Sequence, residues 1–160
     1  MAEFDEVAYD AACHLFHEAK RVRGSLPSLI AQVADTVDML GAQRYDAPNV
    51  TDGGNHVEQA MVDSIGARES LEAKLAESRE HYRKVASDCE SAILDMEQHV
   101  EGDWLDSSVL RYYYMQDMDV QQVAAKLKED GTPYTESWLY QKKEIALVRV
   151  SAAVRRLHLF

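Results

Sequence analysis

The residues best suited to contact another molecule lie in the last helix that the sequence predicts, which begins after Thr135. The apolar residues Leu139, Ala146 and Leu147 recur at helical spacing and predict the face that packs on the rest of the protein. Two shorter amphipathic segments precede this helix, which is the layout of a helix-turn-helix, where the second helix presents its first turns to base edges in a DNA major groove. The chemistry that this spacing predicts is therefore hydrogen bonding to DNA. The polar residues on these early turns are Glu136, Ser137, Tyr140, Gln141, Lys143 and Glu144.

Metal and catalytic chemistry have weaker support in the sequence. Cys13, His14 and His17 lie within one predicted helix, but no second Cys/His cluster accompanies them. No phosphate-binding G-x-x-x-x-G-K-S/T, nucleophilic G-x-S-x-G or zinc-binding H-E-x-x-H motif occurs. Carboxylates are plentiful, but on solvated helices they do not form a catalytic pair. We therefore expect no catalytic residues, no metal site, no cofactor and no enzymatic activity.

Charge is distributed unevenly along the 160 residues. The net charge is −11, and such a balance by itself argues against nucleic acid as a ligand. Residues 131–160, however, hold 5 basic and 2 acidic side chains, so the last predicted helix lies in the one basic segment.

Composition excludes several classes of protein. The 46% of hydrophobic residues and the low Pro and Gly content exclude a disordered chain. No stretch approaches the ~18 to 20 apolar residues of a membrane span. The acidic N-terminus is unlike a signal peptide, and two cysteines in a helical sequence favour a reduced protein. We expect a cytoplasmic location.

The elements that position the last helix are all predicted to be helical. Residues 2–22 are amphipathic, Gly24 and Ser25 interrupt the pattern, and Pro27 suits the first turn of a second helix that ends near Gly41. A short connection between two amphipathic helices predicts an antiparallel hairpin over residues 1–41. Residues 42–55 lack periodicity and contain Pro48 and two glycines, so they are predicted to form a loop.

A long charged helix is predicted over residues 56–101. Its seam positions step by four and three from Val57 to Val100, which is the spacing of an imperfect coiled coil. A helix of this length needs a partner, which can be the N-terminal hairpin, a second copy of the chain, or both. We expect a homodimer through this helix.

Three capped helices are predicted in residues 103–160. Gly102 ends the long helix, and KEDGTPY, residues 128–134, is a turn before the last helix, which runs to about Leu157. The residues that can cap these helices are Asp103 or Asp106, then Asp119, then Thr135.

The last third of the chain carries three matches to one family. Leu110-Arg111-Tyr112 precedes the capped segment VQQVAAKL, Thr135 lies four residues before Leu139, and Ala146-Leu147 follows Leu139 by seven and eight residues. In these features residues 105–157 resemble region 4 of sigma factors and the phage-encoded sigma-like regulators of the RinA and ArpU type. The helical start, polar loop and long charged helix upstream also resemble small phage proteins of this type.

This resemblance implies roles for the residues around Leu139. Gln can pair bidentately with adenine, Glu can accept from cytosine N4, and Ser can contact base or phosphate. The implied base contacts are Glu136, Ser137, Tyr140 and Gln141. The implied phosphate contacts are Thr135, Lys142, Lys143 and Arg149, with Arg155 and Arg156 further along the helix.

The sequence thus predicts an all-α protein that ends in a sigma region 4-like helix-turn-helix over residues 103–160. The expected function is sequence-specific binding of double-stranded DNA in transcription regulation in a phage or prophage, with RNA polymerase as a further partner. The alternative is an acidic helical adaptor or inhibitor that binds a protein through a degenerate helix-turn-helix. The turn at residues 128–134 is several residues longer than in the family, so its geometry distinguishes these two functions.

Overall fold

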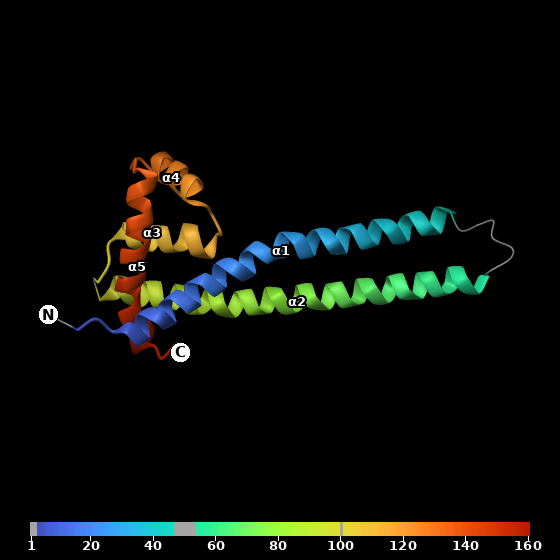
Figure 1. Cartoon of the computed structure of the whole chain (residues 1–160), viewed down its shortest axis with the longest axis horizontal. Coiled ribbons are helices and arrows are strands. Elements are labelled where there is room, and N and C mark those ends of the chain that lie inside the picture. The colour runs from blue at the N-terminus through green and yellow to red at the C-terminus, as the bar shows by residue number, and fades with distance from the viewer. Residues whose placement is uncertain (1–2, 47–53, 100) are drawn as a thin grey trace. The chain divides into compact units, whose positions relative to one another are not determined.

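The computed structural model describes residues 3–46, 54–99 and 101–160, and all regular structure in these ranges is helical (Figure 1). The predicted all-α class is therefore confirmed. No helix in the described ranges has an apolar stretch long enough to cross a membrane. In chain order the elements are α1 (Glu6–Asp46), α2 (Gly54–Gln98), α3 (Trp104–Val109), the π-helix η1 (Leu110–Met115), α4 (Val120–Glu129) and α5 (Glu136–Arg156).

The chain divides into two compact units, and the division cuts through α1 and α2. The larger unit combines residues 1–24 with residues 82–160, and the smaller unit is residues 25–81. The start of α1, the end of α2 and all of the later helices therefore belong to the larger unit. Every residue of the predicted interface lies in this unit.

The predicted N-terminal hairpin is wrong, because α1 continues as one helix from Glu6 to Asp46 with Pro27 inside it. Apolar residues keep helical spacing across the expected break, with Val22 and Leu26 both buried. Gly24 has a packing role instead: a Cβ added there would lie 2.8 Å from Oδ2 of Asp117. The predicted loop at residues 42–55 is also shorter than expected, since α1 ends at Asp46 and α2 begins at Gly54, while Pro48 lies outside the described residues.

The predicted long helix is confirmed as α2, which has 45 residues. The second half of its predicted seam is buried in the core of the larger unit, where it meets α1, η1 and α5. That half of α2 is therefore packed against other helices of the same chain. The buried residues of this first core are Ala12, Phe16, Ala19, Val85, Cys89, Ala92, Ile93, Met96, Leu110, Tyr114, Ala146, Leu147, Val150, Ala153 and Val154.

A second core lies between α3, α4 and the first turns of α5. It contains Leu139 from α5, and the half-buried Tyr134 and Trp138 pack against it. Because α5 contributes Leu139 to this core and its later turns to the first, it joins the two. The buried residues of the second core are Leu105, Val109, Val120, Val123, Leu127 and Leu139.

The π-helix η1 is held by two side chains from other helices. A π-helix departs from regular i to i−4 hydrogen bonding, so its last carbonyls need other partners. The Lys20 ammonium donates to the Tyr113 carbonyl (3.0 Å), and the Tyr82 hydroxyl donates to the Met115 carbonyl (2.6 Å). Lys20 also pairs with Asp117 (3.0 Å), which has a left-handed backbone with φ 52°. These contacts hold the segment that connects η1 to α4.

Replacing Tyr114 with phenylalanine is expected to raise the free energy of unfolding by up to about 1 kcal/mol. The Tyr114 hydroxyl is buried and no group in the described part of the chain hydrogen-bonds to it, so its removal relieves a desolvation cost. Tyr82→Phe is the matched control, because it deletes a made hydrogen bond and should cost about 1 kcal/mol. Urea unfolding measures both. Equal losses of unfolding free energy for the two variants would contradict the conclusion that the Tyr114 hydroxyl has no hydrogen-bond partner.

Candidate nucleic-acid interface

The helices around the predicted interface begin at the caps that the sequence predicts. The Thr135 hydroxyl accepts from the Trp138 N–H (3.2 Å) and begins α5, and Asp119 forms a capping box with Gln122 at the start of α4. Of the two candidates for α3, Asp103 is the cap and accepts from the Asp106 N–H, while the Asp106 carboxylate accepts from the Asp103 N–H. Local sequence therefore determines where each of these helices starts.

The turn between α4 and α5 is regular despite its length. The Thr132 N–H donates to the Leu127 carbonyl (2.9 Å) and the Gly131 N–H to the Lys128 carbonyl (3.1 Å), which is the pair of hydrogen bonds of a Schellman motif. Gly131 has φ +92°, a backbone conformation that glycine adopts without steric cost. The Tyr112 hydroxyl donates to Asp130 (3.2 Å) and connects η1 to the same turn. The turn is well formed, and α5 packs on both α3 and α4.

The four predicted base-contact residues are on the surface at the start of α5. Glu136, Ser137 and Gln141 are exposed, and Tyr140 is 53% exposed. Ser137, Tyr140 and Gln141 are spaced by three and four residues, so they share one face of the helix. Within the described residues, the side chains of Glu136, Ser137 and Gln141 make no hydrogen bond or ion pair. We call these four side chains the polar surface of α5.

Trp138 lies beside this surface and is packed against neighbouring side chains, as is usual for a large aromatic residue. Its indole stacks on the Tyr134 ring with centroids 4.3 Å apart and planes 13° apart. Both rings pack against the second core and are half-buried. Trp138 therefore holds the first turn of α5 to the preceding turn.

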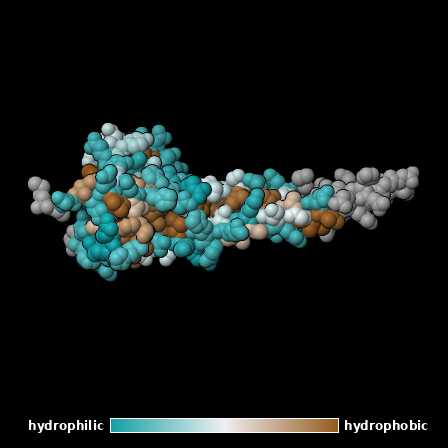
Figure 2. Space-filling model, turned by 60° about the horizontal axis from the view of Figure 1, so that its bottom comes forward, coloured by the Kyte–Doolittle hydropathy of each residue, from teal (hydrophilic) through white to brown (hydrophobic). Residues whose placement is uncertain are grey.

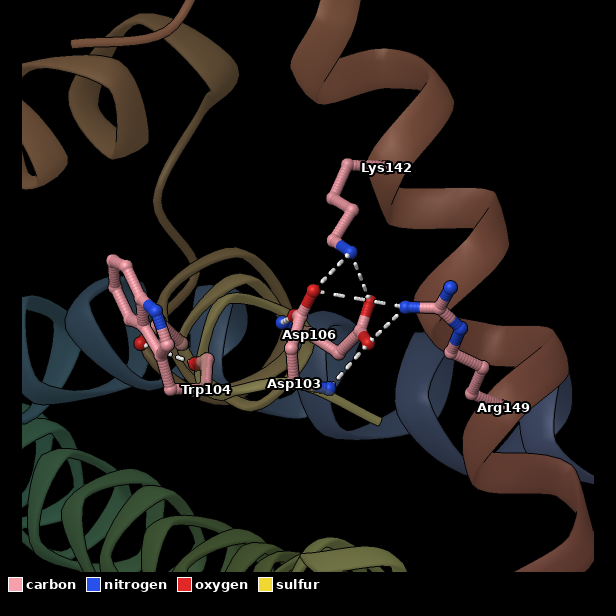
Figure 3. Close-up of polar contacts among 6 residues, drawn as sticks. Asp103, Trp104, Asp106, Lys142 and Arg149 are labelled. Atoms are coloured by element: carbon pink, nitrogen blue, oxygen red, sulfur yellow. Dashed lines mark hydrogen bonds and ion pairs between the residues drawn. The ribbon is translucent and has the colours of Figure 1, made fainter. Parts of the chain in front are cut away.

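Four charged side chains from α3 and α5 form a cluster that sequence reasoning missed (Figure 3). The fully buried Asp106 carboxylate lies 2.9 Å from the Lys142 ammonium and 2.6 Å from the Arg149 guanidinium. Asp103, at the start of α3, pairs with Lys142 as well (3.1 Å). Because the two carboxylates come from α3 and the two cations from α5, the cluster sets how α5 lies on α3.

Hydrogen bonding and charge in this cluster shift two ionisation equilibria. The hydrogen bond to Asp106 raises the pKa of Arg149 above its ordinary value. At Asp103, partial burial acts to raise the pKa of the carboxyl. The hydrogen bonds from the Asp106 N–H and from Lys142 outweigh burial, so this pKa lies below its ordinary value. Asp103 and Arg149 are therefore both charged near neutral pH.

The sequence-based role of Lys142 needs correction. Its residue is only 5% exposed, and its ammonium is held by two carboxylates, so it does not lie on the surface where a phosphate contact was expected. Its position in the apolar row Leu139, Lys142, Ala146, Val150 was the signal for burial. Arg149 is partly exposed, but its guanidinium is also engaged by Asp106.

The other cations near α5 differ in their availability. The Lys143 ammonium lies over the rings of Tyr113 (4.7 Å) and Tyr140 (5.2 Å), and no carboxylate in the described part of the chain pairs with it. Arg155 is paired with Asp5 (2.9 Å), and Arg156 with Asp95 and Glu101. Of the predicted phosphate contacts, Lys143 and the exposed cap Thr135 are the ones that pair with no carboxylate among the described residues.

A metal site has little support in the described residues. Asp95, His99 and Glu101 have potential ligand atoms within 4.8 Å of one another. Arg156 is already paired with both carboxylates of this group, and a guanidinium there opposes a second cation. Cys13, His14 and His17 do not form a ligand group of this kind.

Comparisons of this chain with models of protein families, with curated proteins and with solved structures find no match.

Proposed function

We propose that this protein is a sequence-specific regulator of transcription that binds double-stranded DNA through the polar surface of α5. The observation that carries the proposal is that Glu136, Ser137, Tyr140 and Gln141 are exposed on the first turns of a capped helix. Of these, Glu136, Ser137 and Gln141 make no side-chain hydrogen bond or ion pair within the described residues. Such side chains are available to hydrogen-bond with base edges. The Schellman turn before α5 supports a helix-turn-helix over a degenerate form of it.

The resemblance of residues 105–157 to sigma region 4 supports promoter DNA as the duplex and RNA polymerase as a further partner. The distribution of cations predicts that binding is weak for a single chain. Four basic residues of α5 are paired with carboxylates inside the chain, so few are left to neutralise phosphates. The same pairing favours the second candidate function, an adaptor that binds a protein.

Selection of random duplex DNA by the full-length chain at near-physiological salt tests the proposal. An enriched motif is expected with the natural sequence, and its loss is expected in a Ser137→Ala, Gln141→Ala double variant, because both side chains lie on the polar surface. If the natural sequence enriches no motif, the DNA-binding proposal fails and the adaptor function takes its place. If the double variant enriches the same motif, another surface reads the bases.

Replacing Gln141 with alanine is expected to relax the preference at one base pair, with a loss of about 1–3 kcal/mol of discrimination. The reason is that an amide can form two hydrogen bonds to one adenine, whereas alanine forms none. Binding of single-base variants of the enriched motif measures the effect. Gln98→Ala, an exposed glutamine at the end of α2, is the control and should leave every preference unchanged. Uniform weakening over all sequences would show that Gln141 does not read a base.

Replacing Lys143 with alanine is expected to reduce the slope of log K against log salt concentration by about 1, the value for one phosphate contact. Lys143 is singled out because Lys142 and Arg149 are already paired with Asp106. The control is Lys74→Ala, an exposed lysine of the smaller unit, which should not change the slope. Fluorescence anisotropy over a range of salt concentrations gives the slopes. An unchanged slope for the Lys143 variant would exclude its phosphate contact.

A further inference from the structure

The second half of α5 exposes an apolar row that base recognition does not use. Ile145 and Val148 are each 43% exposed, and Ala152 is half-buried one turn further on. With Gln141 before them and Arg155 after them, these residues are spaced by four, three, four and three. That is the spacing of the contact positions in a coiled coil, so all five lie along one face of the helix. We call this face the α5 seam. The residues that α5 buries in the first core, such as Ala146, Leu147 and Val150, lie on its other side.

A groove beside the α5 seam adds apolar surface. It has a volume of about 510 Å³ and lies between α5 and the N-terminal residues of the same unit, with Phe4, Val148, Ala152 and Arg155 among its lining residues. Phe4 is 61% exposed at its edge. On the face of the molecule seen in Figure 2, patches of hydrophobic residues lie among mostly hydrophilic ones. The row and the groove share Val148 and Ala152, so their apolar residues adjoin, and adjoining apolar residues mark an interaction site more strongly than scattered ones do. The rest of the groove is lined by polar residues, namely Glu3, Asp5, Ser151, Arg155 and Arg156.

We propose that the α5 seam binds the α5 seam of a second copy of this chain, with the two helices antiparallel and the twofold axis beside Val148. Sequence spacing makes this arrangement self-complementary. Val148 meets Val148 of the second copy, Ile145 meets the smaller Ala152, and Gln141 meets Arg155. Large side chains therefore face small ones on either side of the axis, which suits the isologous contact of a twofold dimer.

Charge along the seam selects the antiparallel direction. The exposed acidic residue Glu144 lies toward the start of this face, and the exposed Arg155 lies toward its end. A parallel pair would place Glu144 beside Glu144 of the second copy, whereas an antiparallel pair separates these two carboxylates. Arg155 is already paired with Asp5 of its own chain (2.9 Å), so the direction of the pair depends on Glu144.

This dimer differs from the one that the sequence predicts through the long helix. From Val85 to Met96 the seam of α2 is buried in the first core, so this part of α2 does not offer a surface to another chain. In the smaller unit α2 still exposes Val62 and Ile65. Val62 is therefore the matched control: it is the same residue type as Val148, is exposed on a helix, and lies outside the α5 seam.

Sedimentation velocity of the full-length chain over a range of concentrations, without DNA, tests the proposal. We expect a reversible dimer for the natural sequence and for V62E. For V148E we expect the dimer to weaken by more than about tenfold, because two carboxylates would face each other at the axis. A monomer at all concentrations, or a dimer that V62E disrupts and V148E does not, overturns the proposal. Far-ultraviolet circular dichroism verifies that both variants are folded.

Crosslinking gives a second measurement that does not depend on disrupting the surface. A residue beside a twofold axis meets its own copy, so V148C should form a disulfide between two chains upon oxidation, whereas V62C should not. Peptide mapping separates this disulfide from any formed by Cys13 or Cys89. If V148C forms no such disulfide in a sample shown to be dimeric, the proposal that two α5 seams meet at Val148 is wrong.

One consequence rests on the proposed function. Gln141 belongs to both the polar surface and the α5 seam, so DNA and the second copy would compete for it. The sedimentation and crosslinking experiments contain no DNA. Their failure is therefore distinguishable from failure of the DNA-binding proposal.

Discussion

Replacing Asp106 with asparagine is expected to lower the free energy of unfolding by about 3–5 kcal/mol. The Asp106 carboxylate is fully buried between Lys142 and Arg149. Asparagine is nearly the same size but has no charge, so the substitution leaves the buried Lys142 ammonium with a single carboxylate, that of Asp103. A buried charge without sufficient compensation is one of the few changes that cost a domain this much. Urea or thermal unfolding measures the loss.

Asp103→Asn is the matched control for this substitution. Asp103 belongs to the same cluster, but its side chain is 52% exposed, so its ion pairs are screened by water. Asparagine is also as good a helix cap as aspartate, so the start of α3 is retained. We expect a loss below about 1 kcal/mol. Equal losses for the two variants would show that burial of Asp106 is not what makes the cluster important.

The Asp106 variant also separates the roles of stability and of recognition. The cluster holds α5 on α3, and α5 carries the polar surface. If the proposed function holds, this variant should bind its motif more weakly while keeping the same base preferences, because no base-contacting side chain has changed. A changed preference would mean that the cluster positions the individual side chains on the polar surface.

Replacing Leu147 with alanine is expected to cost about 2–5 kcal/mol of stability. Leu147 is fully buried where α5 meets α1, α2 and η1, so the shorter side chain leaves a cavity in the first core. The adjacent Val148 lies on the exposed side of the same helix. Val148→Ala is expected to change the stability of the single chain by less than about 0.5 kcal/mol, as for other surface positions.

These two neighbouring residues give a direct test of the helical register of α5. Unfolding by urea at low protein concentration, where a dimer would dissociate, compares the two variants as single chains. A large loss for the Val148 variant and a small one for the Leu147 variant would mean that α5 is rotated about its axis. In that case neither the polar surface nor the α5 seam would face outward as described.

Local sequence determined much of this protein. Periodic apolar residues predicted the all-α class and the long helix α2, and the caps at Asp119 and Thr135 predicted the starts of α4 and α5. For α3 the sequence offered Asp103 or Asp106, and the structure has Asp103 as the cap. These features depend on residues within one or two turns of each other, which is why sequence reasoning finds them. The buried face of α5, with Leu139, Ala146 and Leu147, was predicted in the same way.

Tertiary structure decided what depends on residues far apart in the chain. Gly24 and Ser25 were expected to end one helix and Pro27 to begin the next, but α1 continues because its apolar face keeps contacts through that point and Gly24 lies against Asp117. Lys142 was expected to meet a phosphate, but a carboxylate 36 residues earlier in the sequence holds it inside the protein. A side chain's charge is read from the sequence, whereas the partner that neutralises it is set by how helices pack. For this reason the helices could be predicted, while the set of side chains on α5 available to DNA or to a second copy could not.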